Sequence, residues 1–162
     1  MSSFIPSSSV ASDGFQPSSS LVEGSDGYLY GTTYTGGNGF GGNGMAAVVR
    51  LANGGLGPLD EENVWWRFGA GGPNDGGLPE AGLIVGRDGN LYGTTSSGGA
   101  YVRGTVFKLT LSGVETVLWS FGSGADASNL QAPLLQGTDG SFYGVSVTGG
   151  PNGQGALFKV AQ

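Results

Sequence analysis

The chain lacks the two residue types on which much nucleophilic and metal chemistry depends. Its 162 residues contain no histidine and no cysteine. Ser-His-Asp and Cys-His catalysis need an imidazole base, and zinc sites are normally built from His and Cys ligands, so both are excluded within one chain. Disulfides are excluded for the same reason. We therefore expect no metal and no cofactor.

Positive charge is also scarce. Lys and Arg number 6 against 12 Asp and Glu, which gives a net charge of −6 and a pI near 4.2. Such a chain repels phosphate backbones, so nucleic acid is not an expected partner. No run approaches the roughly 18 consecutive apolar residues of a membrane span. The first fifteen residues lack the charged and apolar segments of a signal peptide, so we expect a mature or trimmed start without a membrane span.

Glycine is what the chain has in excess. It supplies 35 residues, about a fifth of the total, against about 7% in average proteins. Aromatic residues are plentiful too, with 6 Tyr, 8 Phe and 3 Trp. Disordered tracts are poor in aromatic and β-branched residues, whereas here both recur at regular spacing between glycines. The composition predicts one turn-rich, all-β domain over residues 1–162.

One motif occurs three times, as L-x-x-G-x-D-G-x-Φ-Y-G, in which Φ is apolar. Its tyrosines, Tyr30, Tyr92 and Tyr143, lie 62 and 51 residues apart. A Gly-Gly pair and an apolar-basic run follow each copy, and a Trp-x-Phe run ending at Phe68 or Phe121 follows the first two. The pattern therefore predicts a unit of four short strands, which is the layout of one β-propeller blade. A two-sheet sandwich is the alternative, but three copies of one motif favour repetition.

The shared residues of the motif have structural interpretations. Asp-Gly, at Asp26, Asp88 and Asp139, signals a tight hairpin, so we interpret these aspartates as turn residues. The repeated tyrosines, together with Trp66 and Trp119, are expected to pack between blades.

The units divide the chain into blades at residues 17–68, 69–121 and 122–162, preceded by a closing strand and its connection at 1–16. The third unit ends after its third strand, while Ser3-Phe4 resembles a fourth strand. Three blades are fewer than the about 4–8 of a closed propeller, so we predict a homo-oligomer. Two chains would form a six-bladed ring in which Ser3 and Phe4 of one chain complete the blade that carries Phe158 and Val160 of the other. Three chains, or an N-terminal segment that is merely an ordered tail, are the alternatives.

Three segments carry a family resemblance: LYGTT-x-x-GG at residues 91–99, GTVFKL at 104–109 and ETVLWSF at 115–121. They resemble the GloVer repeats of bacterial proteins, which are described as extracellular tandem repeats, and the resemblance covers nearly the whole chain. It implies a propeller-like repeat and an extracellular or cell-surface location, and it implies no reaction. An excised or engineered propeller fragment without a ligand is a further interpretation.

Function is expected on one face of the predicted ring. The connections between the second and third strands of a unit, and between units, are long, rich in Gly, Asn and Asp, and emerge on the same face. We expect a non-enzymatic scaffolding or binding module for a neutral polar ligand such as a carbohydrate. A carboxylate-dependent hydrolase or lyase, with Asp75 or Asp126 as acid and base, is the alternative. Each candidate residue also has a plain turn interpretation; the candidates are Asn38, Asn43, Asn74, Asp75, Tyr101, Arg103, Asp126, Asn129, Asn152 and Gln154.

Overall fold

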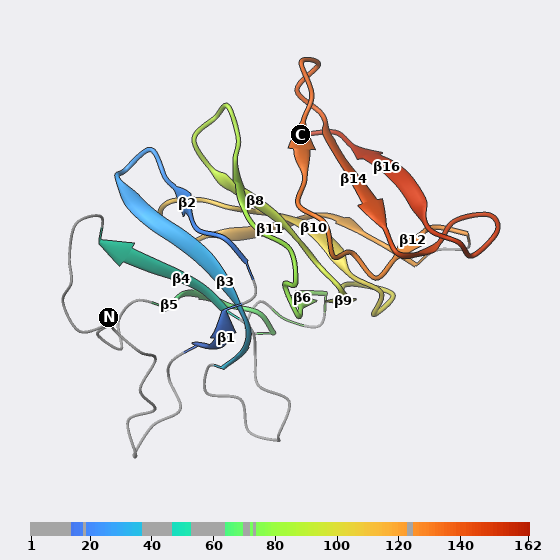
Figure 1. Cartoon of the computed structure of the whole chain (residues 1–162), viewed down its shortest axis with the longest axis horizontal. Coiled ribbons are helices and arrows are strands. Elements are labelled where there is room, and N and C mark those ends of the chain that lie inside the picture. The colour runs from blue at the N-terminus through green and yellow to red at the C-terminus, as the bar shows by residue number, and fades with distance from the viewer. Residues whose placement is uncertain are drawn as a thin grey trace.

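The computed structural model describes residues 14–17, 19–36, 47–52, 64–69, 72, 74–122 and 125–162. These residues form strands and turns and no helix, which confirms the all-β prediction. In this part of the chain there is accordingly no helix with the length and hydropathy to span a membrane. Most of the described strands belong to three repeated sheets, which lie side by side in chain order (Figure 1), and the others form two short two-stranded ladders.

The second sheet shows the repeated unit most completely. It contains β7 (Ile84–Val85), β8 (Leu91–Thr95), β10 (Thr105–Leu109) and β11 (Glu115–Ser120) in the spatial order β11-β10-β8-β7. All neighbours are antiparallel, so the chain simply runs back and forth across the sheet. The turn between β7 and β8 contains Gly89 at φ 78°, a left-handed conformation that favours glycine.

The first sheet has the same order and one additional strand. Its repeated strands are β2 (Val22–Glu23), β3 (Tyr28–Gly36), β4 (Ala47–Ala52) and β5 (Val64–Arg67). The additional strand, β1 (Gly14–Pro17), pairs with the end of β3. All these pairs are antiparallel, as in the second sheet.

The third sheet contains three strands within the described residues. These are β13 (Leu135–Gln136), β14 (Phe142–Ser146) and β16 (Ala156–Val160), in that spatial order. β14 pairs with both neighbours in the register of the second sheet, shifted by one repeat. The strands expected from the repeated motif are thus present in all three units.

The glycine-rich segments expected as loops pair with one another. β6 (Gly76–Gly77) pairs with β9 (Ser97–Gly98), and β12 (Ala127–Ser128) pairs with β15 (Thr148–Gly149). In the first unit, the pairing of β1 with the end of β3 corresponds to these two ladders. These ladders lie at the lower end of the sheets in Figure 1, opposite the hairpin turns that precede β3, β8 and β14.

The hydrophobic core lies between the sheets. Neighbouring residues of β8 point in opposite directions, so Leu91 packs with residues of the first sheet and Tyr92 with residues of the third. Aromatic pairs occupy equivalent positions at the two interfaces: Phe68 meets Phe107 edge to face at 5.0 Å, and Phe121 meets Phe158 at 4.8 Å. Each fully buried Phe contributes about 1.5–3 kcal/mol. The sheets therefore stack face to face, with the same packing repeated from one interface to the next.

Candidate ligand-binding surface

Two glycine-rich loops are held by matching sets of backbone hydrogen bonds. In the loop at residues 96–104, the Gly99 N–H donates to the Asp75 carbonyl at 2.8 Å, and the Gly104 N–H donates to the Gly98 carbonyl at 3.0 Å. The loop at 147–155 repeats both bonds in the third unit, at 3.0 and 2.9 Å. Their backbones are therefore fixed by the ladders beneath them, and the side chains at the loop tips are presented in defined positions.

Tyr101 and Arg103 are the two candidate residues in the first of these loops. Both are exposed, and Tyr101 keeps 53% of its accessible surface. They flank Gly122, where an added Cβ would lie 2.8 Å from Tyr101 Cβ and 2.9 Å from Arg103 Cδ. Gly122 has φ 118°, so both the space and the backbone angle require glycine there. The structure thus places Tyr101 and Arg103 at the surface beside the same glycine.

Asp126 is paired with a residue that the sequence analysis placed in the core. The indole N–H of Trp119 donates to Asp126 Oδ2 at 3.2 Å, and the Ala127 N–H donates to Oδ1 at 2.8 Å. Trp119 is 48% exposed, so its predicted burial between blades is wrong. Trp66 has the same register in the first unit but is half-buried, packed against the core between the first and second sheets.

Asn152 and Gln154 take the places of Tyr101 and Arg103 in the loop of the third unit, and both are exposed. Asn74 is also exposed.

Two other candidates stabilise the backbone. Asp75 is only 7% exposed, and its Oδ2 accepts a bond from the Gly69 N–H at 2.6 Å. Asn129 adopts φ 58°, and its carbonyl accepts a bond from the Val147 N–H at 3.1 Å. These contacts match the turn interpretation of both residues.

Four predictions lie outside the described residues: the ligand residues Asn38 and Asn43, and the closing residues Ser3 and Phe4.

Phe158 and Val160, which were expected at the closing contact, lie on β16 with their side chains against the second sheet. Any role in closure therefore passes through the backbone edge of β16 rather than through these side chains.

The family model described as the Gloeobacter/Verrucomicrobia repeat matches residues 3–162. The chain belongs to this repeat family. The resemblance to GloVer repeats is thereby confirmed. A search of curated proteins found no match.

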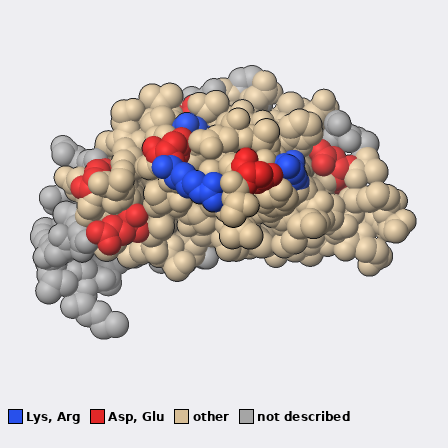
Figure 2. Space-filling view, turned by 90° about the horizontal axis from the view of Figure 1, so that it is seen from above, with Lys and Arg blue, Asp and Glu red and all other residues tan. Residues whose placement is uncertain are grey.

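The second and third Gloeobacter/Verrucomicrobia repeats of this chain also build a charged cluster at the hairpin turn. Asp88 Oδ2 accepts bonds from the Tyr92 hydroxyl and from Lys108 Nζ, both at 2.8 Å. Asp139 binds Tyr143 and Lys159 in the same way, both at 2.9 Å. Figure 2, seen from above, shows neighbouring acidic and basic side chains in a row across an otherwise largely uncharged face.

These clusters were not predicted from the sequence, because the aspartate was interpreted as a turn residue and the tyrosine as a core residue. The missed signal was the basic residue that faces each motif tyrosine in the next strand. Lys108 pairs with Tyr92 in register, Lys159 with Tyr143, and Arg50 stands opposite Tyr30.

The electrostatics of these clusters fit an ion pair rather than an acid–base catalyst. Burial works to raise the pKa of Asp88, but bonds from Lys108, Asn90 and Tyr92 outweigh it and hold this pKa well below its usual range. Burial and the neighbouring Asp88 raise the pKa of Tyr92, and the bond to Asp88 raises the pKa of Lys108. At neutral pH the carboxylate therefore stays charged, the phenol stays protonated and the amine stays charged.

Proposed function

We propose that the chain is a non-enzymatic, propeller-type binding module. The observation that carries this proposal is the repeated stacking of antiparallel sheets with equivalent aromatic contacts at both interfaces. A β-sandwich packs two sheets, whereas a propeller repeats one sheet-to-sheet contact around an axis. The three units would form three blades, and a second copy would complete a six-bladed ring.

The ligand surface of this module is the face that carries the two fixed loops. Tyr101 supplies a flat ring on which a sugar can stack, and Arg103 supplies several donors for hydroxyl groups. Asn152 and Gln154 supply amide donors and acceptors at the equivalent place in the next unit. A neutral polar ligand such as a carbohydrate suits this mixture. Weak sites repeated around a ring would add through multivalency.

The proposed ring closes through the edge of the third sheet. β16 pairs with β14 on one side, and no described strand pairs with its other side. In the proposed ring, the strand added to this edge would cover the half-exposed indole of Trp119. The N-terminal residues of a second copy, including Ser3 and Phe4, are our proposed occupant of this edge. We also propose an extracellular or cell-surface location, on the basis of the family resemblance.

Ligand binding is tested by a glycan array followed by titration of the best binders. We expect saturable binding that Tyr101→Ala and Arg103→Gln each weaken at least tenfold. Arg87→Gln is the matched control, since Arg87 is an exposed arginine at the opposite, hairpin end of the second sheet. Equal binding by all variants would overturn the assignment of the surface, and release of products from the bound glycan would overturn the non-enzymatic assignment.

Closure is tested by light scattering on the full chain and on a chain without residues 1–6. We expect the full chain to have twice the 16.2 kDa mass of one copy, and the deletion to weaken the dimer. The tryptophan emission of the full chain should shift to shorter wavelength on dimerisation, because the added strand covers Trp119. A dimer unaffected by the deletion would overturn strand exchange.

A further inference from the structure

The two interior interfaces define a pair of complementary faces on every sheet. We call the side that contacts the following sheet the forward face, and the side that contacts the preceding sheet the backward face. On the second sheet the forward face includes Tyr92 and Val106, both fully buried. They pack against the backward face of the third sheet, which includes Phe142 at 0% and Leu134 at 5% exposure.

The forward face of the third sheet carries apolar side chains that nothing in the described structure covers. Leu157 is 75% exposed, whereas Val106 at the same register position of the second sheet is 0% exposed. Val145 is 50% exposed, whereas its counterpart Thr94 is 1% exposed. Leu135 is 69% exposed. The third sheet thus presents a surface of the type that is buried between its predecessors.

The backward face of the first sheet shows the complementary pattern. Leu21 is 50% exposed, whereas the matching leucines of the next two motifs, Leu83 and Leu134, are 6% and 5% exposed. Leu29, which corresponds to the buried Phe142, is half-buried. The two ends of the stack therefore expose the two halves of one interface.

We propose that the forward face of the third sheet binds the backward face of the first sheet of a second copy of this chain, head to tail. The proposal rests on the ring proposed above and names the surfaces that would close it. Two copies related by a twofold axis would form this contact twice and leave neither face exposed. The proposed occupant is a second copy of this chain. Its first sheet carries a backward face like those of the second and third sheets, which already pack against forward faces inside the chain.

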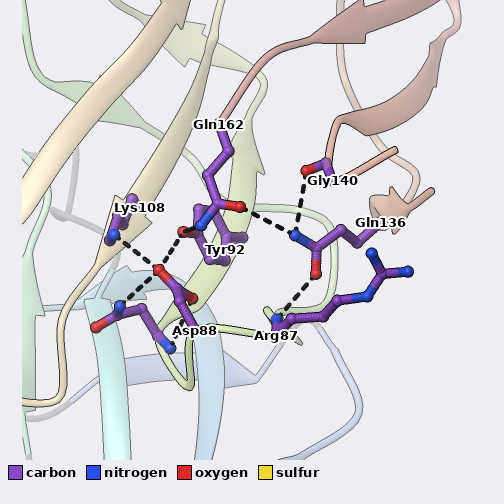
Figure 3. Close-up of polar contacts among 8 residues, drawn as sticks. Arg87, Asp88, Tyr92, Lys108, Gln136, Gly140 and Gln162 are labelled. Carbon is purple, nitrogen blue, oxygen red and sulfur yellow. Dashed lines mark hydrogen bonds and ion pairs between the residues drawn. The ribbon is translucent and has the colours of Figure 1, made fainter. Parts of the chain in front are cut away.

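The polar rim of the interior interface supports this pairing. Across that interface Gln136 accepts a bond from the Arg87 N–H at 2.9 Å, and Gln162 donates to the Tyr92 hydroxyl at 3.1 Å (Figure 3). Glu23 is the counterpart of Gln136 in the first sheet and is exposed. In the proposed contact its carboxylate would stand where Gln136 accepts the Arg87 N–H bond inside the chain. The exposed backward face of the first sheet therefore keeps a hydrogen-bond acceptor at this rim position as well as its apolar surface.

The first experiment measures the mass of single variants by light scattering. Leu157→Asp places a charge in the proposed contact, and Val102→Asp is its matched control, since both side chains are 75% exposed. We expect the unchanged chain and the control to be dimers, and Leu157→Asp to have the 16.2 kDa mass of one copy with an unchanged circular dichroism spectrum. A monomeric unchanged chain, or a Leu157→Asp variant that still forms the dimer, would overturn the inference.

The second experiment establishes the head-to-tail arrangement by mixing two variants. Leu157→Asp and Leu21→Lys should each be monomeric alone, because each carries a charge in both copies of the contact. Their mixture should form a dimer, since one contact is then unchanged and the other pairs Asp with Lys. Failure of the mixture to assemble would overturn the head-to-tail arrangement. Masses that keep growing with concentration would support the pairing of the faces but overturn the closed ring of the proposed function.

Discussion

The hydroxyl of Tyr92 donates a hydrogen bond of 2.8 Å to the carboxylate of Asp88, four residues earlier in the chain. Asp88 also accepts a bond from the Asn90 N–H at 3.1 Å inside the hairpin turn, so the bond to Tyr92 ties the turn to β8. The same pair recurs as Asp26 with Tyr30 at 2.7 Å and as Asp139 with Tyr143 at 2.9 Å. The spacing of aspartate and tyrosine in the motif is therefore set by a side-chain contact as well as by the turn.

Tyr92→Phe should lower the free energy of unfolding by about 1–3 kcal/mol, because its hydroxyl binds a charged carboxylate and the ring is fully buried. Tyr143→Phe is the matched variant, since its partners are equivalent but its side chain is only half-buried, and it should cost less than half as much. Urea denaturation measures both. Equal losses would contradict the assigned dependence on burial.

Gly93→Ala should destabilise the protein by about 1–3 kcal/mol through overpacking. An added Cβ would lie 2.7 Å from Cζ of Phe107, whose ring is buried against the first sheet. Gly82→Ala is the control, because its Cβ would lie no closer than 3.6 Å to Ser19. Thermal unfolding should separate the two variants clearly, and a Gly93→Ala variant as stable as the control would contradict the packing.

Glu115→Gln should stabilise the protein at neutral pH and change its pH dependence. Burial first, and then the charge of Asp75, raise the pKa of Glu115 from 4.5 to about 7, and its buried Oε1 has no hydrogen-bond partner among the described residues. The folded state therefore holds this proton more tightly than the unfolded state, so the contribution of Glu115 to stability falls as pH rises from about 4.5 to 7.

The glutamine variant should lose that dependence and gain about 1–2 kcal/mol at pH 8, less than the full shift implies because the side chain is only partly buried. Unfolding measured at half-unit steps from pH 4.5 to pH 8 checks this. Parallel curves for the two proteins would contradict the prediction.

Thr95→Val should loosen the loop that carries Tyr101 and Arg103. The buried Thr95 Oγ1 accepts a bond from the Thr105 N–H at 3.0 Å and donates to the Ser97 carbonyl at 2.9 Å, so it spans the base of the loop. Valine keeps the shape and removes both bonds, together with the 2.9 Å hydrogen bond between Thr95 Oγ1 and Thr105 Oγ1, at a cost of about 1–3 kcal/mol. Hydrogen exchange should become faster in residues 96–104, whereas the exposed Thr116→Val should leave it unchanged.

The repeated motif was enough to predict the strands, because Asp-Gly turns and alternating apolar residues fix both the position and the register of each hairpin. The ladders between the connections were not predictable in this way. Gly76–Gly77 and Ser97–Gly98 are two-residue strands without apolar alternation, and only their mutual position in space pairs them. Tyr101 and Arg103 were found from residue type and loop length. Their convergence on Gly122 depends on the fold.

Trp119 shows why a repeat alone misleads. Its local sequence resembles that of Trp66, so the pattern predicts the same environment for both. In the structure Trp66 packs against the core between the first and second sheets, whereas Trp119 is 48% exposed and its N–H binds Asp126.

A change from apolar to polar residues at two positions distinguishes the two interior interfaces and gives the stack an order. Val85 and Leu111 pack against the first core cluster, whereas their counterparts in the third unit are Gln136 and Gln162, which bond to each other at 3.3 Å. Exchanging the second unit for the third would bury two amides among apolar side chains and leave two aliphatic side chains facing polar partners. The glutamine pair therefore distinguishes the third unit from the similar second unit, and it disfavours packing of the units in the wrong order during folding.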